Sequence, residues 1–145
     1  MMQDDYRRAP APTAGSLENL VLLTHVIYAL HAFAVVTGVV GSASVIGSFV
    51  ASVPSILAVI LNYAKRSAVR GTWLESHFRW QIRTFWFAVL WIAVAVLLIV
   101  TLIGIPFAFA VLAGAGLWVI YRVGRGWWNL AQRDTMPVPP PPPGL

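Results

Sequence analysis

The sequence contains no cysteine and very little charge, and each shortage excludes a class of chemistry. Without cysteine, the chain cannot form disulfides, use a thiolate nucleophile or bind a metal through sulfur. Only 10% of its 145 residues are charged and 59% are hydrophobic, whereas a typical soluble domain has about 25% charged residues. Such a chain has too few polar side chains to cover the surface of a soluble domain. We therefore expect an integral membrane protein.

Acidic residues are also absent from the interior of every long apolar run. A hydrolase that uses paired carboxylates, or a two-metal enzyme, would need acidic side chains brought together. A proton pump or an ion-coupled carrier would need them inside the membrane. We therefore expect no enzymatic activity and no cofactor. The five acidic residues are Asp4, Asp5, Glu18, Glu75 and Asp134.

Four apolar runs account for most of the chain. At about 1.5 Å per residue, runs of this length can cross a hydrocarbon core of roughly 30 Å as helices. Short links near Gly41 and Gly104 make the first two and the last two runs antiparallel neighbours. The sequence therefore predicts an all-α integral membrane four-helix bundle built from two short-linked helical hairpins. The predicted spans cover about 20–40, 45–63, 84–103 and 105–123.

The ends of the chain differ in composition from the domain at 17–130. Residues 1–16 mix charges with proline, alanine and glycine, which predicts a mobile tail. Residues 131–145 contain an unbroken run of prolines from Pro139 to Pro143, which predicts a disordered proline-rich tail. Such a tract takes the polyproline II form, and it either docks in an aromatic groove of a partner or acts only as a semi-rigid tail.

Basic residues gather in three segments that four spanning helices would place on one side of the membrane. The opposite turns, near Gly41 and Gly104, carry no charge. The positive-inside rule therefore predicts that both termini and the central loop lie in the cytoplasm. Topology and lipid head groups explain the net charge of +5 without any need for nucleic acid as a partner. The basic residues are Arg7, Arg8, Lys65, Arg66, Arg70, Arg79, Arg83, Arg122, Arg125 and Arg133.

Residues 65–86 are the only long polar segment between the apolar runs. Thr72 and Glu75 have the spacing of a capping box, which predicts that a helix starts at Trp73. The sequence therefore predicts an interfacial cytoplasmic helix over about residues 73–83. Glu75 also precedes Arg79 by four residues, the favourable order for a helical ion pair.

Arginine and tryptophan side chains are frequent in this segment and again at the end of the fourth run. Tryptophan rings prefer the level of the lipid head groups, and arginine can reach phosphates from there. The pattern predicts an interface with anionic lipid head groups or with a partner protein; the alternative is that these residues only fix the topology. The predicted interface consists of Lys65, Arg66, Arg70, Trp73, His77, Arg79, Trp80, Arg83, Trp86, Arg122, Arg125, Trp127 and Trp128.

Three histidines and one tyrosine are the other candidates for chemistry. His77 has no second histidine or cysteine close in sequence, so we expect it to form hydrogen bonds at the interface rather than to act as a base or a metal ligand. His25, Tyr28 and His31 lie within the first span as intramembrane polar residues. The two histidines there point about 240° apart, so one metal or haem cannot be held from one face, and haem would need a homodimer. We expect each to bond threonine, tyrosine or a backbone carbonyl of another helix.

Small residues recur every fourth position in the second and fourth runs. Small-xxx-small spacing lets two backbones approach closely in lipid. The predicted packing face comprises Gly47, Ala51 and Ser55 in one helix, and Ala110 and Gly114 in another. Such a face either packs inside the monomer or against other membrane proteins or a second copy of the chain.

The central segment resembles a group of small bacterial membrane proteins of unknown function. The resemblance covers roughly residues 20–130 and is carried by Gly71-Thr72-Trp73, by residues 76–86, by Trp118, Tyr121, Arg122, Gly126 and Trp127, and by His25 with Tyr28. The group is distantly similar to the four-helix subunit of the chloroplast inner-envelope protein translocon. The resemblance implies a four-helix fold in the bacterial inner membrane, and it does not by itself imply translocation.

We therefore expect a non-enzymatic accessory or scaffold subunit that packs against other membrane proteins or itself and contacts membrane lipids. The alternative is a transport or protein-translocation component with a polar path between its helices. Such a path would be lined by Thr24, His25, Thr37, Ser48, Ser52, Ser55 and Thr101.

Overall fold

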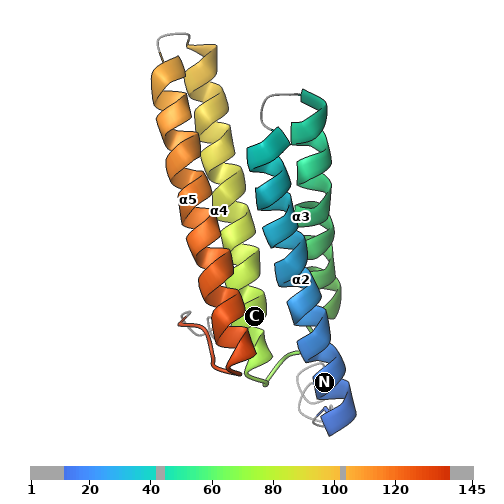
Figure 1. Ribbon diagram of the computed structural model, residues 1–145. Helices are drawn as coiled ribbons and strands as arrows, with labels where there is room; N and C mark the ends of the chain where they lie inside the picture. The colour runs from blue at the N-terminus through green and yellow to red at the C-terminus, as the bar shows by residue number, and fades with distance from the viewer. Residues whose placement is uncertain (1–11, 42–44, 102–103, 138–145) are drawn as a thin grey trace, which may run out of the picture.

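The computed structural model describes the backbone of residues 12–41, 45–101 and 104–137, and all side chains in these ranges except those of 39–41 and 45–51. Over these ranges the chain is helical and contains no strand. The prediction of an all-α chain with four long helices is confirmed. The helices are α2 (Ala14–Gly41), α3 (Val45–Lys65), α4 (Leu74–Val100) and α5 (Ile105–Ala131) (Figure 1).

Three helical stretches are long and apolar enough to cross a membrane: Ala14–Gly38, Leu74–Val100 and Ile105–Ala131. This is compatible with the expected membrane protein. The side chains of α3 are described only from Ser52 onward, so a fourth span at 45–63 stays a prediction.

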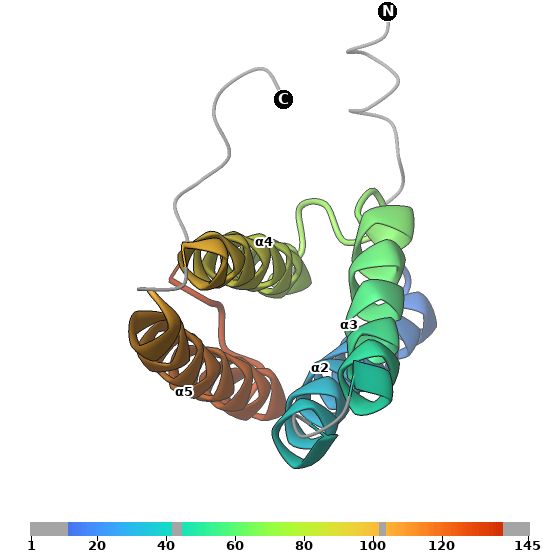
Figure 2. The ribbon, with the colours of Figure 1, turned by 90° about the horizontal axis from the view of Figure 1, so that it is seen from above.

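The helices lie side by side with their axes roughly aligned (Figure 1). The most extensive contacts are between α2 and α3 and between α4 and α5, and α2 also packs on α5. Seen from above, the four helices follow an arc in the order α3, α2, α5, α4 (Figure 2). The end of the molecule where α3 and α5 end and α4 begins is called the basic end below. The opposite end, where α3 and α5 begin, is called the distal end.

The first helix begins earlier than the apolar run, because Thr13 caps it. The Thr13 side-chain oxygen accepts the backbone N–H of Ser16 at 3.3 Å, and the Thr13 carbonyl accepts the N–H of Leu17. Ser16 is therefore a residue of the first turn.

Helix α4 begins at Leu74, one residue after the predicted start, but not through a capping box. The Thr72 hydroxyl donates to the carbonyl of Val69 rather than capping the helix, and the Glu75 carboxylate accepts the N–H of Gly71. Gly71 has a φ of +72°, a conformation that side chains disfavour. From Leu74 the helix continues unbroken to Val100, so the expected interfacial helix and third span form one element.

The turn into α5 requires a glycine at Gly104. A Cβ there would lie 2.9 Å from the backbone carbon of Leu98, too close for any side chain. Helix α5 then begins at Ile105, and Pro106 occupies its first turn, where its missing N–H costs no hydrogen bond.

The chain does not become a free tail at residue 131, contrary to the sequence prediction. Arg133 has a φ of 60° and reverses the chain, so that its N–H bonds the carbonyl of Leu130 and the N–H of Asp134 bonds that of Asn129. Met136 is then buried, and its N–H donates to the Ser76 hydroxyl at 2.9 Å. The proline run lies outside the described residues.

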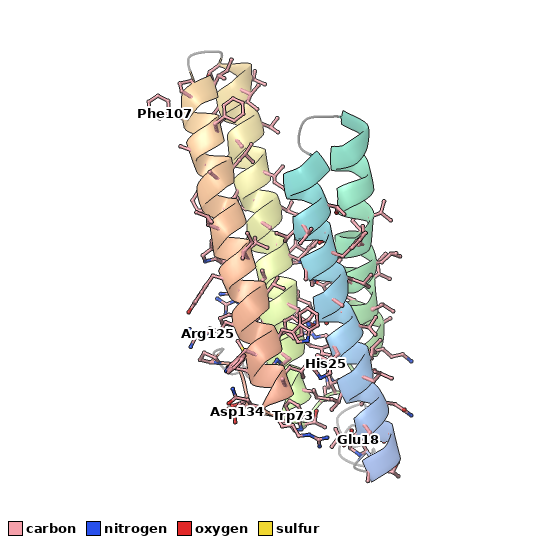
Figure 3. All side chains as sticks on the ribbon, in the orientation of Figure 1. Glu18, His25, Trp73, Phe107, Arg125 and Asp134 are labelled. Atoms are coloured by element: carbon pink, nitrogen blue, oxygen red, sulfur yellow. The ribbon has the colours of Figure 1, made fainter. Side chains whose placement is uncertain are left out.

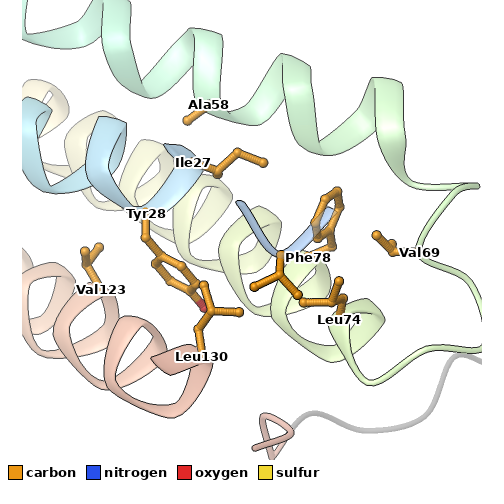
Figure 4. Packing of buried hydrophobic residues seen from close by; sticks show 9 residues of the cluster. Ile27, Tyr28, Ala58, Val69, Leu74, Phe78, Val123 and Leu130 are labelled. Atoms are coloured by element: carbon orange, nitrogen blue, oxygen red, sulfur yellow. The ribbon is translucent and has the colours of Figure 1, made fainter. Parts of the chain in front are cut away.

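The hydrophobic core lies in the half of the molecule nearer the basic end. Figure 4 shows its side chains packed between the helices. Its largest side chains, Tyr28 and Phe78, are at most 1% exposed. In the distal half, by contrast, large apolar side chains such as Leu97 and Phe109 are about two-thirds exposed or more. The core cluster consists of Val21, Ile27, Tyr28, Ala58, Val69, Leu74, Phe78, Val123 and Leu130.

Candidate functional site

His77 is the centre of a buried polar cluster at the basic end. Its Nε2 lies 2.7 Å from the backbone carbonyl of Asp134, and its Nδ1 lies 3.0 Å from the Tyr28 hydroxyl. A carbonyl can only accept, so Nε2 carries the proton; in the neutral ring Nδ1 therefore accepts the bond that Tyr28 donates. Trp73 packs edge-on against the imidazole, with 5.6 Å between ring centroids. One side chain of α4 thus connects α2 to the segment that follows α5.

Gly126 allows α5 to approach this cluster closely. A Cβ at this position would lie 2.6 Å from Cε1 and 2.7 Å from Cζ of Tyr28. No side chain other than hydrogen fits there, because ordinary carbon contacts are about 3.5–4.0 Å. The glycine therefore sets the distance between α5 and the tyrosine of α2.

Arg122 joins α5 to α4 through a second set of contacts. Its guanidinium stacks over the Trp80 ring at 3.5 Å from the centroid, and its Nε donates to the Thr84 hydroxyl at 2.7 Å. In return the Trp80 indole N–H donates to the Arg122 carbonyl at 3.1 Å. The planar guanidinium suits stacking and directed hydrogen bonding at once. The guanidinium of Arg122 therefore contacts side chains of α4 and does not simply extend from the surface.

The two histidines of α2 bond side chains of different neighbours. His25 accepts the indole N–H of Trp127 in α5 at 3.0 Å. His31 forms a hydrogen bond of 3.1 Å with Ser55 in α3. The expectation that each histidine bonds another helix is confirmed, but the partners are tryptophan and serine rather than threonine, tyrosine or a carbonyl.

The predicted interface residues separate by burial. His77 and Trp80 are buried, so they hold helices together and are not available to lipid or to a partner. The other members are exposed or half-buried, and Figure 3 places Trp73 and Arg125 at the basic end. Trp86 donates to the Tyr63 hydroxyl at 3.0 Å. The exposed members are Lys65, Arg66, Arg70, Arg83, Trp86, Arg125, Trp127 and Trp128, and the half-buried ones are Trp73, Arg79 and Arg122.

The expected ion pair between Glu75 and Arg79 is not formed. The Glu75 carboxylate turns back to Gly71, as described above. The Nε and Nη1 atoms of Arg79 are buried and have no hydrogen-bond partner in the described chain. The one ion pair between described residues joins Arg133 to Glu18 at 2.8 Å, and both of its side chains are about 60% exposed.

The small-residue positions have different surroundings. Ser55 lies between α3 and α2, where it bonds His31. Ala110 and Gly114 are exposed, and a Cβ added at Gly114 would have no atom of the described chain within 4 Å. At these two positions α5 is therefore not covered by the described part of the chain. The side chains at Gly47 and Ala51 lie outside the described residues.

Two buried amides were not expected from the sequence. Asn62 is fully buried in α3 and Gln81 is 2% exposed in α4, and neither side chain has a hydrogen-bond partner among the described residues. Each lies in an otherwise ordinary helical stretch, and no spacing pattern singled either out.

The cluster is built to join helices. Its hydrogen bonds connect α2, α4, α5 and the segment up to Met136. Within the described residues, no three histidine, aspartate or glutamate side chains come close enough together to bind a metal ion. No family model, curated protein or solved structure matches the chain.

Proposed function

We propose that the chain is a multi-pass protein of the bacterial inner membrane with both termini in the cytoplasm. Large apolar side chains are exposed on all helices in the distal half, and a bilayer would cover them. The exposed arginines gather at the other end, where the first described residues, the central loop and the segment after α5 also lie (Figure 3). The positive-inside rule assigns that end to the cytoplasm.

Within the membrane, the proposed role is that of a non-enzymatic accessory or scaffold subunit. The observation that carries this proposal is the open face of α5 at Ala110 and Gly114, which the described residues leave uncovered. In lipid such a face brings helix backbones close to those of a neighbour. The neighbour would be another membrane protein or a second copy of the chain.

The polar residues of the spans support this role over a transport path. Thr24, Thr37 and Thr101 each donate to a carbonyl of their own helix. His25 and His31 bond single side chains on neighbouring helices. A conduction path would need such groups to line one continuous polar cavity. The cavity between the central loop and α4 and the hollow at the end of α5 are both lined by other residues.

Single cysteines test the orientation cleanly, because the chain has none of its own. Thr101 and Ser67 are both exposed, the first at the distal end and the second in the central loop. Thr101→Cys in intact cells should react with a membrane-impermeant thiol reagent, and Ser67→Cys should react only after the cells are opened. The reverse labelling pattern would refute the proposed topology.

The scaffold role is tested on the small-residue face. Gly114→Leu should reduce the association of the tagged chain with a second copy or with its membrane partner, measured by crosslinking in the membrane. Gly124→Leu is the matched control, because Gly124 is also exposed on α5 with open space around it. A chain that crosslinks to no protein, or one whose crosslinking survives Gly114→Leu, contradicts the proposed use of this face.

A further inference from the structure

A small cavity lies where the central loop folds against the first turns of α4. It has a volume of about 40 Å³. Val69 is fully buried and, with Phe78 of α4, it anchors the loop over the core. The cavity is lined by Arg66, Val69, Arg70, Glu75, Phe78, Arg79 and Ile82.

Three of the lining residues are arginines, and only Glu75 carries the opposite charge. The Glu75 carboxylate already accepts the N–H of Gly71 at 2.9 Å and forms no ion pair within the described chain. The cavity also adjoins the first turn of α4, where the helix dipole favours an anion. Among the lining residues, positive charges therefore outnumber negative ones.

Arg79, one of the lining residues, lacks an acceptor among the described residues for two of its nitrogens. Its Nε and Nη1 are buried without a hydrogen-bond partner in the described residues. A buried charged donor without a partner is costly, and a phosphate oxygen is an acceptor that forms strong, charge-assisted hydrogen bonds with a guanidinium. Arg122, by contrast, uses its Nε on Thr84 and its guanidinium face on Trp80. Of these two half-buried arginines, Arg122 has partners for its Nε and its guanidinium face, whereas the Nε and Nη1 of Arg79 have no acceptor among the described residues.

We propose that this cavity binds the phosphate group of an anionic membrane lipid, with Arg79 as the central ligand and Arg66 and Arg70 as further positive charges. The inference rests on the proposed membrane insertion, because that places the basic end at the level of the head groups. It narrows the broad predicted interface to one site. The exposed Arg83 and Arg125, which do not line the cavity, have no part in it.

The test is lipid binding to the purified full-length chain in detergent, measured by native mass spectrometry during titration with phosphatidylglycerol. Arg79→Gln should weaken binding about tenfold or more, as expected for the loss of a charge-assisted hydrogen bond. Arg83→Gln is the matched control, since it removes the same charge from an exposed position of the same helix, and it should leave binding nearly unchanged. Equal losses for the two variants would mean a diffuse charge effect and would overturn the site.

A second variant should strengthen binding, which misfolding does not do. Glu75→Gln removes the only negative charge in the lining and keeps an oxygen that can accept the Gly71 N–H. Phosphatidylglycerol should then bind roughly threefold more tightly, the scale of a partly exposed charge interaction. Unchanged or weaker binding by Glu75→Gln would contradict an anion in this cavity.

Two further probes identify the source of the phosphate. Diacylglycerol has the same chains without the phosphate, and it should bind without regard to Arg79; equal binding of both lipids overturns the proposal. Inorganic phosphate should not displace phosphatidylglycerol at comparable concentration, and displacement would assign the cavity to a free anion and overturn the lipid. The cysteine labelling of Thr101 and Ser67 does not involve Arg79, so it reports a failure of the proposed topology independently.

Discussion

Tyr28 of α2 contacts both α4 and α5 at the basic end. Its ring fills the core between α2 and α5 (Figure 4), and its hydroxyl reaches His77 of α4. Gly126 lies directly against the ring, so the position of α5 and the hydrogen bond of Tyr28 to His77 depend on the same placement of the tyrosine side chain. Even a change of one methyl or one hydroxyl group at Gly126 or Tyr28 should therefore lower the stability of the protein measurably.

Gly126→Ala should lower the thermal midpoint of the detergent-solubilised protein, because the new Cβ would overlap the Tyr28 ring. Overpacking of this kind costs about 1–3 kcal/mol. Gly124→Ala, two residues earlier on an open face, introduces the same change and should leave the midpoint unchanged or slightly raised. If the two alanine variants melt alike, the close approach of α5 to Tyr28 is wrong.

Tyr28→Phe isolates the hydroxyl from the ring. The variant keeps the packing but leaves His77 Nδ1 buried without its donor, which should destabilise the protein by about 1–3 kcal/mol. Thermal unfolding monitored by tryptophan fluorescence measures this loss, and Trp73 beside the imidazole supplies a local signal. The exposed Tyr121→Phe, which loses a bond only to Arg125 four residues along the same helix, is the control and should cost much less. Equal costs would place the Tyr28 hydroxyl outside the core.

At the scale of elements, the segment after α5 acts as a clasp on the start of α4. The reversal at Arg133 directs the chain back, and the carbonyl of Asp134 and the N–H of Met136 both bond α4. The exposed ion pair of Arg133 with Glu18 adds little, since such pairs contribute about 0–1 kcal/mol. Burial of Met136 and the two hydrogen bonds hold the clasp in place.

Ser76→Ala removes the acceptor of the Met136 N–H. The Met136 amide should then exchange with deuterium faster, by about tenfold for a loss near 1.4 kcal/mol. Hydrogen exchange followed by mass spectrometry of the C-terminal peptide measures the change. Ser67→Ala, in the exposed loop, should leave that peptide unchanged. A peptide that already exchanges at the rate of free chain in the unaltered protein would refute the clasp.

Sequence reasoning located the helices but not the cluster that joins them, and the reason is physical. Helices α4 and α5 are recognisable in the sequence as long apolar runs, with a glycine and a proline at the turn between them. His77, however, bonds residues 49 and 57 positions away, and one of those partners is a backbone carbonyl that any residue would offer. Met136 stands beside a proline-rich tract, so composition assigned it to a free tail. Which residues meet across such sequence separations depends on how the helices pack, and a local sequence pattern does not determine that packing.

At the scale of the whole molecule, the two halves differ in how their apolar side chains are covered. Those of the basic half are buried by the protein itself, whereas many of those in the distal half are exposed. The basic half has a packed core with a polar cluster, whereas the distal half packs mainly along the seam of each helix pair. Ala95 and Ala108 are buried along α4 and α5, while most larger side chains near them are exposed. In water this distal surface would be an aggregation site, and in a bilayer it is the surface that lipid requires.

In the proposed bilayer setting, a charge introduced at an exposed apolar position has the opposite effect from the one it has in a soluble protein. Ile92 is 54% exposed in α4, within the predicted third span. In a soluble domain Ile92→Lys would be nearly neutral, but near the centre of a bilayer a lysine costs about 2.5–3.5 kcal/mol. We expect a large loss of membrane-inserted protein, measured as the fraction that resists alkaline extraction from membranes. Ala131→Lys, at an exposed position of the basic end, should insert normally. If Ile92→Lys inserts as well as Ala131→Lys, the distal half is not covered by lipid, and its apolar surface must be covered by another protein at that position.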